Sequence, residues 1–130
     1  MAKTADKSAR RVVIGPGVFA RSFFVGECHD VLQRWRNGKI RPVVTRDLLA
    51  AYVRVFRALG LPDVQLRKWL YWFTSKETSD FLPEPAHSQD APLPRLLFDA
   101  AQRGHAEFIV TSSPADSLVR VTWARVNQRP

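Results

Sequence analysis

The chain has 130 residues, of which 45% are hydrophobic and 25% are charged, and its net charge is +8. This length and composition fit one folded soluble domain and exclude a disordered or fibrous chain. The excess of basic residues favours polyanionic partners such as nucleic acid. Fifteen of the twenty basic residues are arginine, so a generally Arg-rich composition would also account for the charge.

Targeting and redox signals are sparse. Cys28 is the sole cysteine, which excludes an intrachain disulfide, and we expect it to be a buried thiol. The apolar stretch from Val12 to Val25 is interrupted by Gly15, Pro16, Gly17 and Arg21, so it predicts neither a membrane span nor a signal peptide. We therefore expect a cytoplasmic protein without membrane contact.

Residues 1–10 are polar and basic and are predicted to form a flexible tail, with a single domain over residues 11–130. Strands are predicted over residues 11–14, 41–45, 79–82, 108–111 and 118–126. Helices are predicted over residues 18–24, 28–37, 46–59, 62–75 and 96–103, and loops over residues 83–94 and 112–117. Gly38, Gly60 and Gly104 are expected to end helices. Short strands alternating with helices predict an α/β fold with a central, mostly parallel sheet of four to five strands and helices on both faces.

Three blocks of sequence carry a family resemblance. The first is the strand Arg11–Ile14 with the following Gly15-Pro16-Gly17, the second runs from Val43 to Tyr52, and the third from Ala101 to Thr111. Their order and spacing resemble the PIN-domain family in its toxin-like branch, the ribonuclease components of toxin–antitoxin systems. The resemblance extends to about Val121 and implies a PIN-like three-layer sandwich.

The resemblance also implies acidic residues that this chain lacks. In the family, three or four carboxylates at the carboxyl ends of the strands hold Mg²⁺ or Mn²⁺ ions, which activate water for phosphodiester cleavage. The corresponding positions here are Gly15, Ala51, Pro94 and Ser113, and Gly17 replaces the family's Asn. We therefore expect no catalytic residue and no cofactor, and predict a pseudonuclease that binds nucleic acid, RNA rather than DNA, or a protein partner.

An active ribonuclease with displaced ligands is the alternative, and it would need Mg²⁺ or Mn²⁺. The remaining candidates for such a metal site are Asp47, Asp90 and Asp116. Asp47 is predicted in the first turn of a helix, where a carboxylate often only complements the helix dipole. The other two are predicted in loops.

The carboxyl edge of a parallel sheet is where such folds bind ligands. The residues expected at this edge form a candidate site for an anion such as an RNA phosphate: Gly15, Gly17, Arg21, Thr45, Arg46, Arg95, Thr111, Ser112 and Ser113. In the competing interpretation, Arg21 extends to solvent, Thr45 only caps its helix and the serines only form a turn.

Two aromatic and basic segments suggest further contacts. Tyr71 and Trp72 cannot share the predicted buried face of their helix, so they are candidates for a homodimer interface. A dimeric interaction module that captures an antitoxin-like peptide is a third possible function. The basic segment from Arg34 to Arg41 is expected at the opposite edge of the sheet, where it would add non-specific affinity, while Trp35 is expected in the core.

Overall fold

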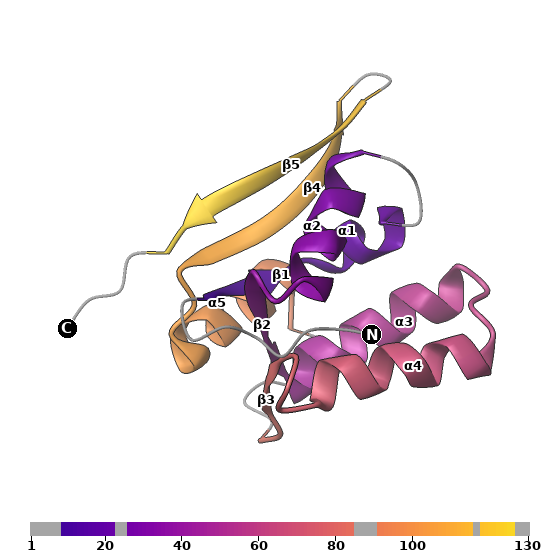
Figure 1. The fold of residues 1–130 in the computed structure, drawn as a ribbon, viewed down its shortest axis with the longest axis horizontal. Coiled ribbons are helices and arrows are strands. Elements are labelled where there is room, and N and C mark those ends of the chain that lie inside the picture. Colours follow the sequence, from indigo (N-terminus) through magenta and orange to yellow (C-terminus); the bar gives the residue numbers. More distant parts are fainter. Residues whose placement is uncertain (1–8, 23–25, 85–90, 116–117, 127–130) are drawn as a thin grey trace.

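The computed structural model describes residues 9–22, 26–84, 91–115 and 118–126, with the backbone alone described for residues 113–115, 118 and 119. Figure 1 shows the path of the chain. The strands are β1 (Arg10–Ile14), β2 (Ile40–Thr45), β3 (Asp80–Leu82), β4 (Phe108–Ala115) and β5 (Leu118–Arg125), and the helices are α1 (Pro16–Arg21), α2 (Glu27–Arg36), α3 (Arg46–Ala58), α4 (Asp63–Thr74) and α5 (Leu93–Gly104).

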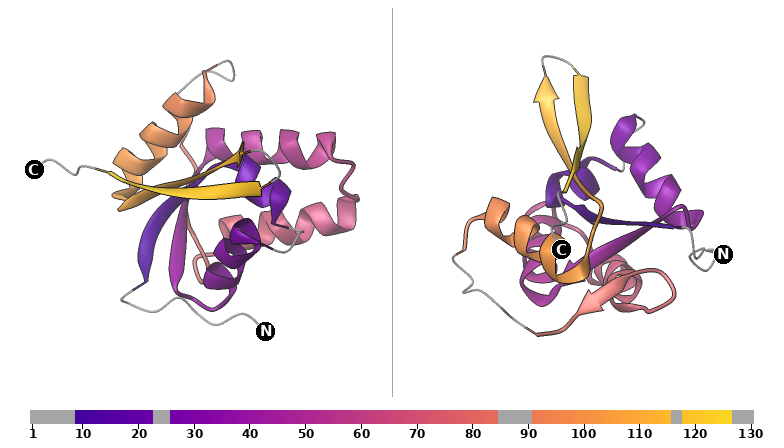
Figure 2. Two further views of the ribbon diagram at one scale, coloured as in Figure 1. Left: turned by 90° about the horizontal axis from the view of Figure 1, so that it is seen from above. Right: turned by 90° about the vertical axis from the view of Figure 1, so that its left-hand side faces the viewer.

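The five strands form one mixed sheet in the order β3-β2-β1-β4-β5. The first four are parallel, and β5 runs antiparallel to β4. Val12, Val13 and Ile14 of β1 are all fully buried. Because successive side chains of a strand point to opposite faces, both faces of the sheet are covered. Figure 2 shows α5 on one side of the sheet and α2 and α4 on the other. The predicted α/β fold with a mostly parallel sheet is confirmed.

Close packing of α5 against β2 explains Gly104. A Cβ atom at Gly104 would lie 2.2 Å from Cγ1 of Val43, so only glycine fits at this contact. The predicted role of Gly104 as a helix stop is wrong. The helix includes Gly104, and the residue that leaves it in the left-handed conformation is His105, with φ 53°. Sequence alone could not separate these roles, because glycine serves both.

The opposite face of the sheet carries an aromatic core. Phe19 contacts Trp35, Tyr52 and Phe73, with ring centroids 5.0–5.7 Å apart. The Tyr52 hydroxyl donates a hydrogen bond to the Ile14 carbonyl, which joins α3 to β1. Trp35 therefore belongs to the core, as predicted. Leu59, which continues the predicted apolar stripe of α3, is 57% exposed because the helix ends before it.

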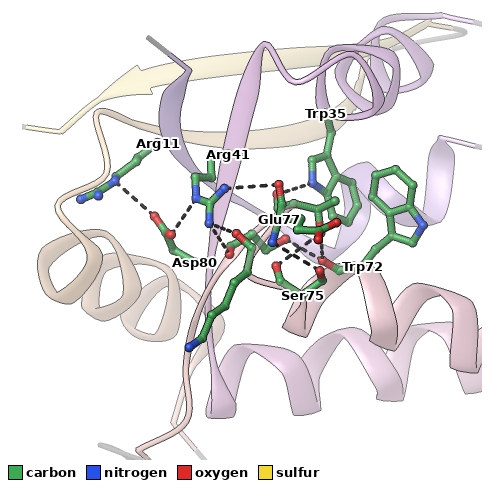
Figure 3. A network of polar contacts seen from close by, with 10 residues as sticks. Arg11, Trp35, Arg41, Trp72, Ser75, Glu77 and Asp80 are labelled. Atoms are coloured by element: carbon green, nitrogen blue, oxygen red, sulfur yellow. Dashed lines mark hydrogen bonds and ion pairs between the residues drawn. The ribbon is translucent and has the colours of Figure 1, made fainter. Parts of the chain in front are cut away.

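A polar network fixes the short edge strand β3 (Figure 3). The Asp80 carboxylate accepts a hydrogen bond from Nε of Arg41 at 2.7 Å and forms an ion pair with Arg11 at 3.2 Å. Arg41 also donates to the carbonyls of Lys76, Glu77 and Ser79. Trp35 Nε1 donates to the Thr78 carbonyl at 2.9 Å. These contacts, together with the packing of Phe81 and Leu82 against the core, hold a strand of only three residues at the edge of the sheet.

Three predicted boundaries need correction. The loop predicted over residues 112–117 is wrong for residues 112–115, which continue β4 and pair with β5 as far as Ala115 opposite Leu118, while residues 116 and 117 lie outside the described residues. The helix predicted over residues 18–24 begins at Pro16, and α5 begins at Leu93 with Pro94 in its first turn. Proline lacks only an N–H group that has no partner in the first turn of a helix, so it starts a helix readily.

Candidate functional site

A groove of about 380 Å³ lies at the carboxyl edge of the sheet, between the start of α1, one side of α3 and the start of α5. Its lining includes Pro16, Gly17, Ala51, Arg54, Leu93 and Leu96. Two of the positions that the family resemblance assigns to acidic or amide residues, Gly17 and Ala51, face this groove. Apart from Arg54, this lining is apolar.

Gly15 connects β1 to α1 and occupies the N-cap position of the helix. Its N–H donates to the Val110 carbonyl at 2.8 Å, and its carbonyl accepts from the Val18 N–H at 3.1 Å. A Cβ atom here would lie 3.5 Å from the Val110 oxygen and 3.6 Å from Thr111 Cγ2, which are ordinary contacts. The backbone at Gly15 has φ −68°, so neither space nor conformation requires glycine. A residue with a Cβ atom is therefore compatible with the fold at this position.

The Arg21 side chain extends past Gly17 and reaches β4. Its guanidinium Nη1 donates a 2.7 Å hydrogen bond to Oγ of Ser112. A Cβ atom at Gly17 would lie 2.8 Å from the same nitrogen, so the missing side chain leaves space for the guanidinium. Val110 pairs with Ile14 at the end of β1, and Ser112 follows two residues later. A positive charge therefore stands just beyond the carboxyl end of β1 and beside the middle of β4.

The other residues predicted at this edge have different surroundings. The Thr45 side chain is fully buried and accepts a hydrogen bond from the Leu48 N–H at 3.1 Å, so it caps α3 and does not face a ligand, contrary to the predicted binding role. Arg46 and Arg95 are exposed in the first turns of α3 and α5. Thr111 and Ser112 are half-buried. Ser113 lies in β4 and is described by its backbone alone.

Acidic residues do not gather here in the described part of the chain. Asp47 is half-buried in the first turn of α3, and Asp90 and Asp116 lie outside the described residues. Within residues 9–22, 26–84, 91–115 and 118–126, no three His, Cys, Asp or Glu side chains are grouped to hold a metal ion. A hard cation such as Mg²⁺ needs several oxygen ligands, and those residues do not supply a cluster of them.

Cys28 lies close to the same cluster. It is buried in α2, and burial raises the pKa of its thiol despite a hydrogen bond with Ser112 and the charge of Arg21, which both lower it. A thiol with a raised pKa is a poor nucleophile. The predicted structural role of Cys28 is therefore supported by its environment.

Comparison with known proteins gives no match. No protein family, no curated protein and no solved structure matches this chain. Among the helices that the structure describes, none is long and apolar enough to cross a membrane.

A second groove, of about 550 Å³, lies at the opposite edge of the sheet. Its lining includes Arg10, Arg34, Lys39, Phe108, Trp123 and Arg125. Sequence reasoning placed the segment from Arg34 to Arg41 at this edge, and the structure confirms that placement. It missed the contribution of Trp123 and Arg125, because the direction of β5 decides which of its ends reaches this edge. The alternation within residues 118–126 does not indicate that direction.

The candidate interface residues of α4 differ from each other. Tyr71 is 67% exposed, as expected for a residue off the buried face. Trp72 is half-buried and packs edge-on against Trp35, with ring centroids 5.3 Å apart. A shallow pocket of about 190 Å³ beside it is lined by aromatic side chains and by Arg36 and Lys68. Tyr71 is the more accessible of the two for a contact between protomers.

Proposed function

We propose that this protein is a PIN-like pseudonuclease, a three-layer domain that binds RNA at the carboxyl edge of its sheet without a metal ion and without cleaving it. The observation that carries the proposal is the position of Arg21. Its guanidinium is hydrogen-bonded to Ser112 of β4, just beyond the carboxyl end of β1, and the neighbouring positions that resemble family acids hold Gly15 and Ala51.

A guanidinium at this place changes what the site attracts. In the family, carboxylates bind a cation, and that cation binds the phosphate. With the described carboxylates dispersed, the positive charge of Arg21 repels a metal ion and attracts a phosphate oxygen directly. Ser112 is one neutral acceptor, whereas the guanidinium carries five N–H donors in a planar fork. The fork therefore retains donors for a phosphate.

The exposed arginines at the same edge support this assignment. Arg46 and Arg95 begin α3 and α5, both of which start at the carboxyl edge. Their charges add to the attraction for a polyanion that passes over the groove. Thr45 has no part in the proposed contact, because its side chain is buried.

The test is RNA affinity in the variant Arg21→Gln, which removes the charge and keeps a polar side chain. Arg57→Gln, at the exposed end of α3, is a matched control with the same change in net charge. We expect Arg21→Gln to weaken binding of a labelled single-stranded RNA about fivefold or more, with little change in Arg57→Gln and no effect of EDTA on either. Equal affinities in the two variants would reject the carboxyl-edge site.

The apolar lining of the groove favours a second candidate function. Leu93 is 40% exposed, and it lines the groove with Leu96, Val55 and Ala58. Such a surface suits an apolar peptide segment better than a phosphate. A protein partner, such as an antitoxin-like peptide, would therefore bind through Leu93. In that case, Leu93→Asp would abolish partner binding and leave RNA affinity unchanged.

A further inference from the structure

The groove at the amino edge of the sheet is lined by basic residues from three elements and from one turn. Arg10 begins β1, Arg34 lies in the last turn of α2, and Lys39 immediately precedes β2. Gly38, with φ 72°, turns the chain sharply between the last two. Because β5 is antiparallel, its final residue Arg125 reaches the same edge, opposite Phe108 at the start of β4.

Two aromatic rings hold two of these arginines in place. The Arg34 guanidinium carbon lies 5.3 Å from the centre of the Trp123 ring, and that of Arg125 lies 5.2 Å from the centre of the Phe108 ring. The rings themselves meet edge to face, with centroids 6.2 Å apart. Both rings are half-buried and both arginines are exposed. Stacking uses the face of a guanidinium and leaves its N–H edge directed at solvent, where it can bind a phosphate.

The charge of the groove is mostly uncompensated. Arg10 forms an ion pair with Glu107 at 3.1 Å, and both side chains are largely exposed. Within the described residues, no ion pair joins Arg34, Lys39 or Arg125 to a carboxylate. Three positive charges thus line one concave surface of about 550 Å³ together with two aromatic side chains. Basic grooves with aromatic side chains are typical of proteins that bind single-stranded nucleic acid.

We infer that this amino-edge groove binds the sugar–phosphate backbone of a single-stranded nucleic acid, with Arg34, Lys39 and Arg125 contacting phosphates. A concave groove admits one strand, whereas a duplex would contact only its rim. Trp123 and Phe108 act by positioning the two guanidinium groups. The inference rests on the proposed function only in that both require nucleic-acid binding, and the two sites lie at opposite edges of the sheet.

The experiment compares two triple variants of the full chain. R34Q/K39Q/R125Q removes the charges of the groove. The control R57Q/R67Q/K76Q removes three exposed charges from the end of α3, from α4 and from the turn after α4, so the net charge is the same. Anisotropy of a labelled 20-nucleotide oligo(U) is measured from 50 to 300 mM KCl, with Arg21→Gln in parallel. Circular dichroism and melting temperature show that each variant is folded.

We expect the groove variant to weaken binding at least tenfold at 100 mM KCl, and to reduce the slope of log K against log salt by about 2, because three phosphate contacts are lost at roughly 0.7 each for a single strand. The control should change affinity less than threefold. R34K/R125K, which keeps the charge but loses the stacked planar groups, should fall between the groove variant and the wild type.

The outcomes separate the two proposals. Equal losses in the groove variant and the control would overturn this inference, because only net charge would then matter. If the groove variant matches the wild type while Arg21→Gln loses affinity, the inference fails and the proposed carboxyl-edge site stands. If the groove variant loses affinity while Arg21→Gln binds like the wild type, the inference stands and the proposed carboxyl-edge site fails. Failure of the wild type to bind oligo(U) would overturn both.

Discussion

The close contact between Gly104 and Val43 predicts that a larger residue at position 104 destabilises the fold. In Gly104→Ala, the new methyl group would lie 2.2 Å from Cγ1, 2.9 Å from Cγ2 and 3.0 Å from Cβ of Val43. Carbon atoms pack at about 3.5–4.0 Å, so helix and strand must separate by roughly 1.3 Å or more. Val43 is fully buried in an inner strand and has little freedom to rotate away.

The size of the effect follows from two opposing terms. Overpacking of a core costs about 1–3 kcal/mol, and the depth of this overlap places it near the upper value. Alanine gains about 1 kcal/mol over glycine in helix propensity, and less at a helix end. We expect a net destabilisation of about 2 kcal/mol, which for a domain of this size lowers the melting temperature by roughly 6–8 °C.

Thermal and urea unfolding followed by circular dichroism measure this change. The neighbouring His105→Gly is the control, because it relieves a left-handed residue and is expected to be neutral or to stabilise by about 1 kcal/mol. Adding Val43→Ala to Gly104→Ala should recover part of the loss relative to the sum of the single variants. A Gly104→Ala protein as stable as the wild type would refute the described packing of α5 on β2.

Two further predictions concern buried polar groups. Thr45→Ala removes the cap of α3 and should destabilise the fold by about 1–2 kcal/mol in urea unfolding, while an unchanged midpoint would show that Thr45 is not the cap. Tyr52→Phe removes the hydrogen bond to the Ile14 carbonyl and should cost about 1–2 kcal/mol at pH 7. Burial raises the pKa of Tyr52 far above 10.0, so the native state holds this proton more tightly than the unfolded chain. Stability from this group is present below pH 10 and is lost as the pH rises further, and Tyr52→Phe should therefore show a shallower alkaline loss. Equal alkaline slopes in the two proteins would contradict that assignment.

The elements that sequence predicted well are those with strong local signals. Val12 to Ile14 and Val43 to Thr45 are apolar runs that read as buried strands, and Thr45 is a recognisable helix cap. The extension of β4 through Ser112 to Ala115 has no such signal, because its hydroxyls and proline are typical of a turn. Pairing with β5 keeps this polar segment extended, and pairing is a tertiary effect.

The candidate sites, too, were predicted where local sequence signals place them and missed where tertiary contacts do. Gly15, Gly17 and Arg21 follow the end of β1, a relation that sequence order reveals. Ser112 lies beside them within β4, the parallel neighbour of β1. The hydrogen bond from Arg21 to Ser112 joins residues 91 positions apart and depends on the space left by Gly17. The amino-edge groove needs β5 to run antiparallel, which the short connection between β4 and β5 enforces, since parallel strands need a crossover of about a dozen residues. The interpretation of the sequence did not use that connection, so it located the basic segment from Arg34 to Arg41 without its aromatic partners.

Binding without cleavage is the central claim, and a single experiment tests it most directly. A labelled single-stranded RNA is incubated with the protein in Mn²⁺ and, separately, in EDTA, and its anisotropy and its integrity on a denaturing gel are followed together. We predict the same affinity in both conditions and intact RNA throughout, because the described residues hold no cluster of metal ligands and Arg21 supplies the positive charge. Cleavage that requires Mn²⁺ and is lost in Asp90→Asn would contradict the account and establish a metal site built from displaced acids.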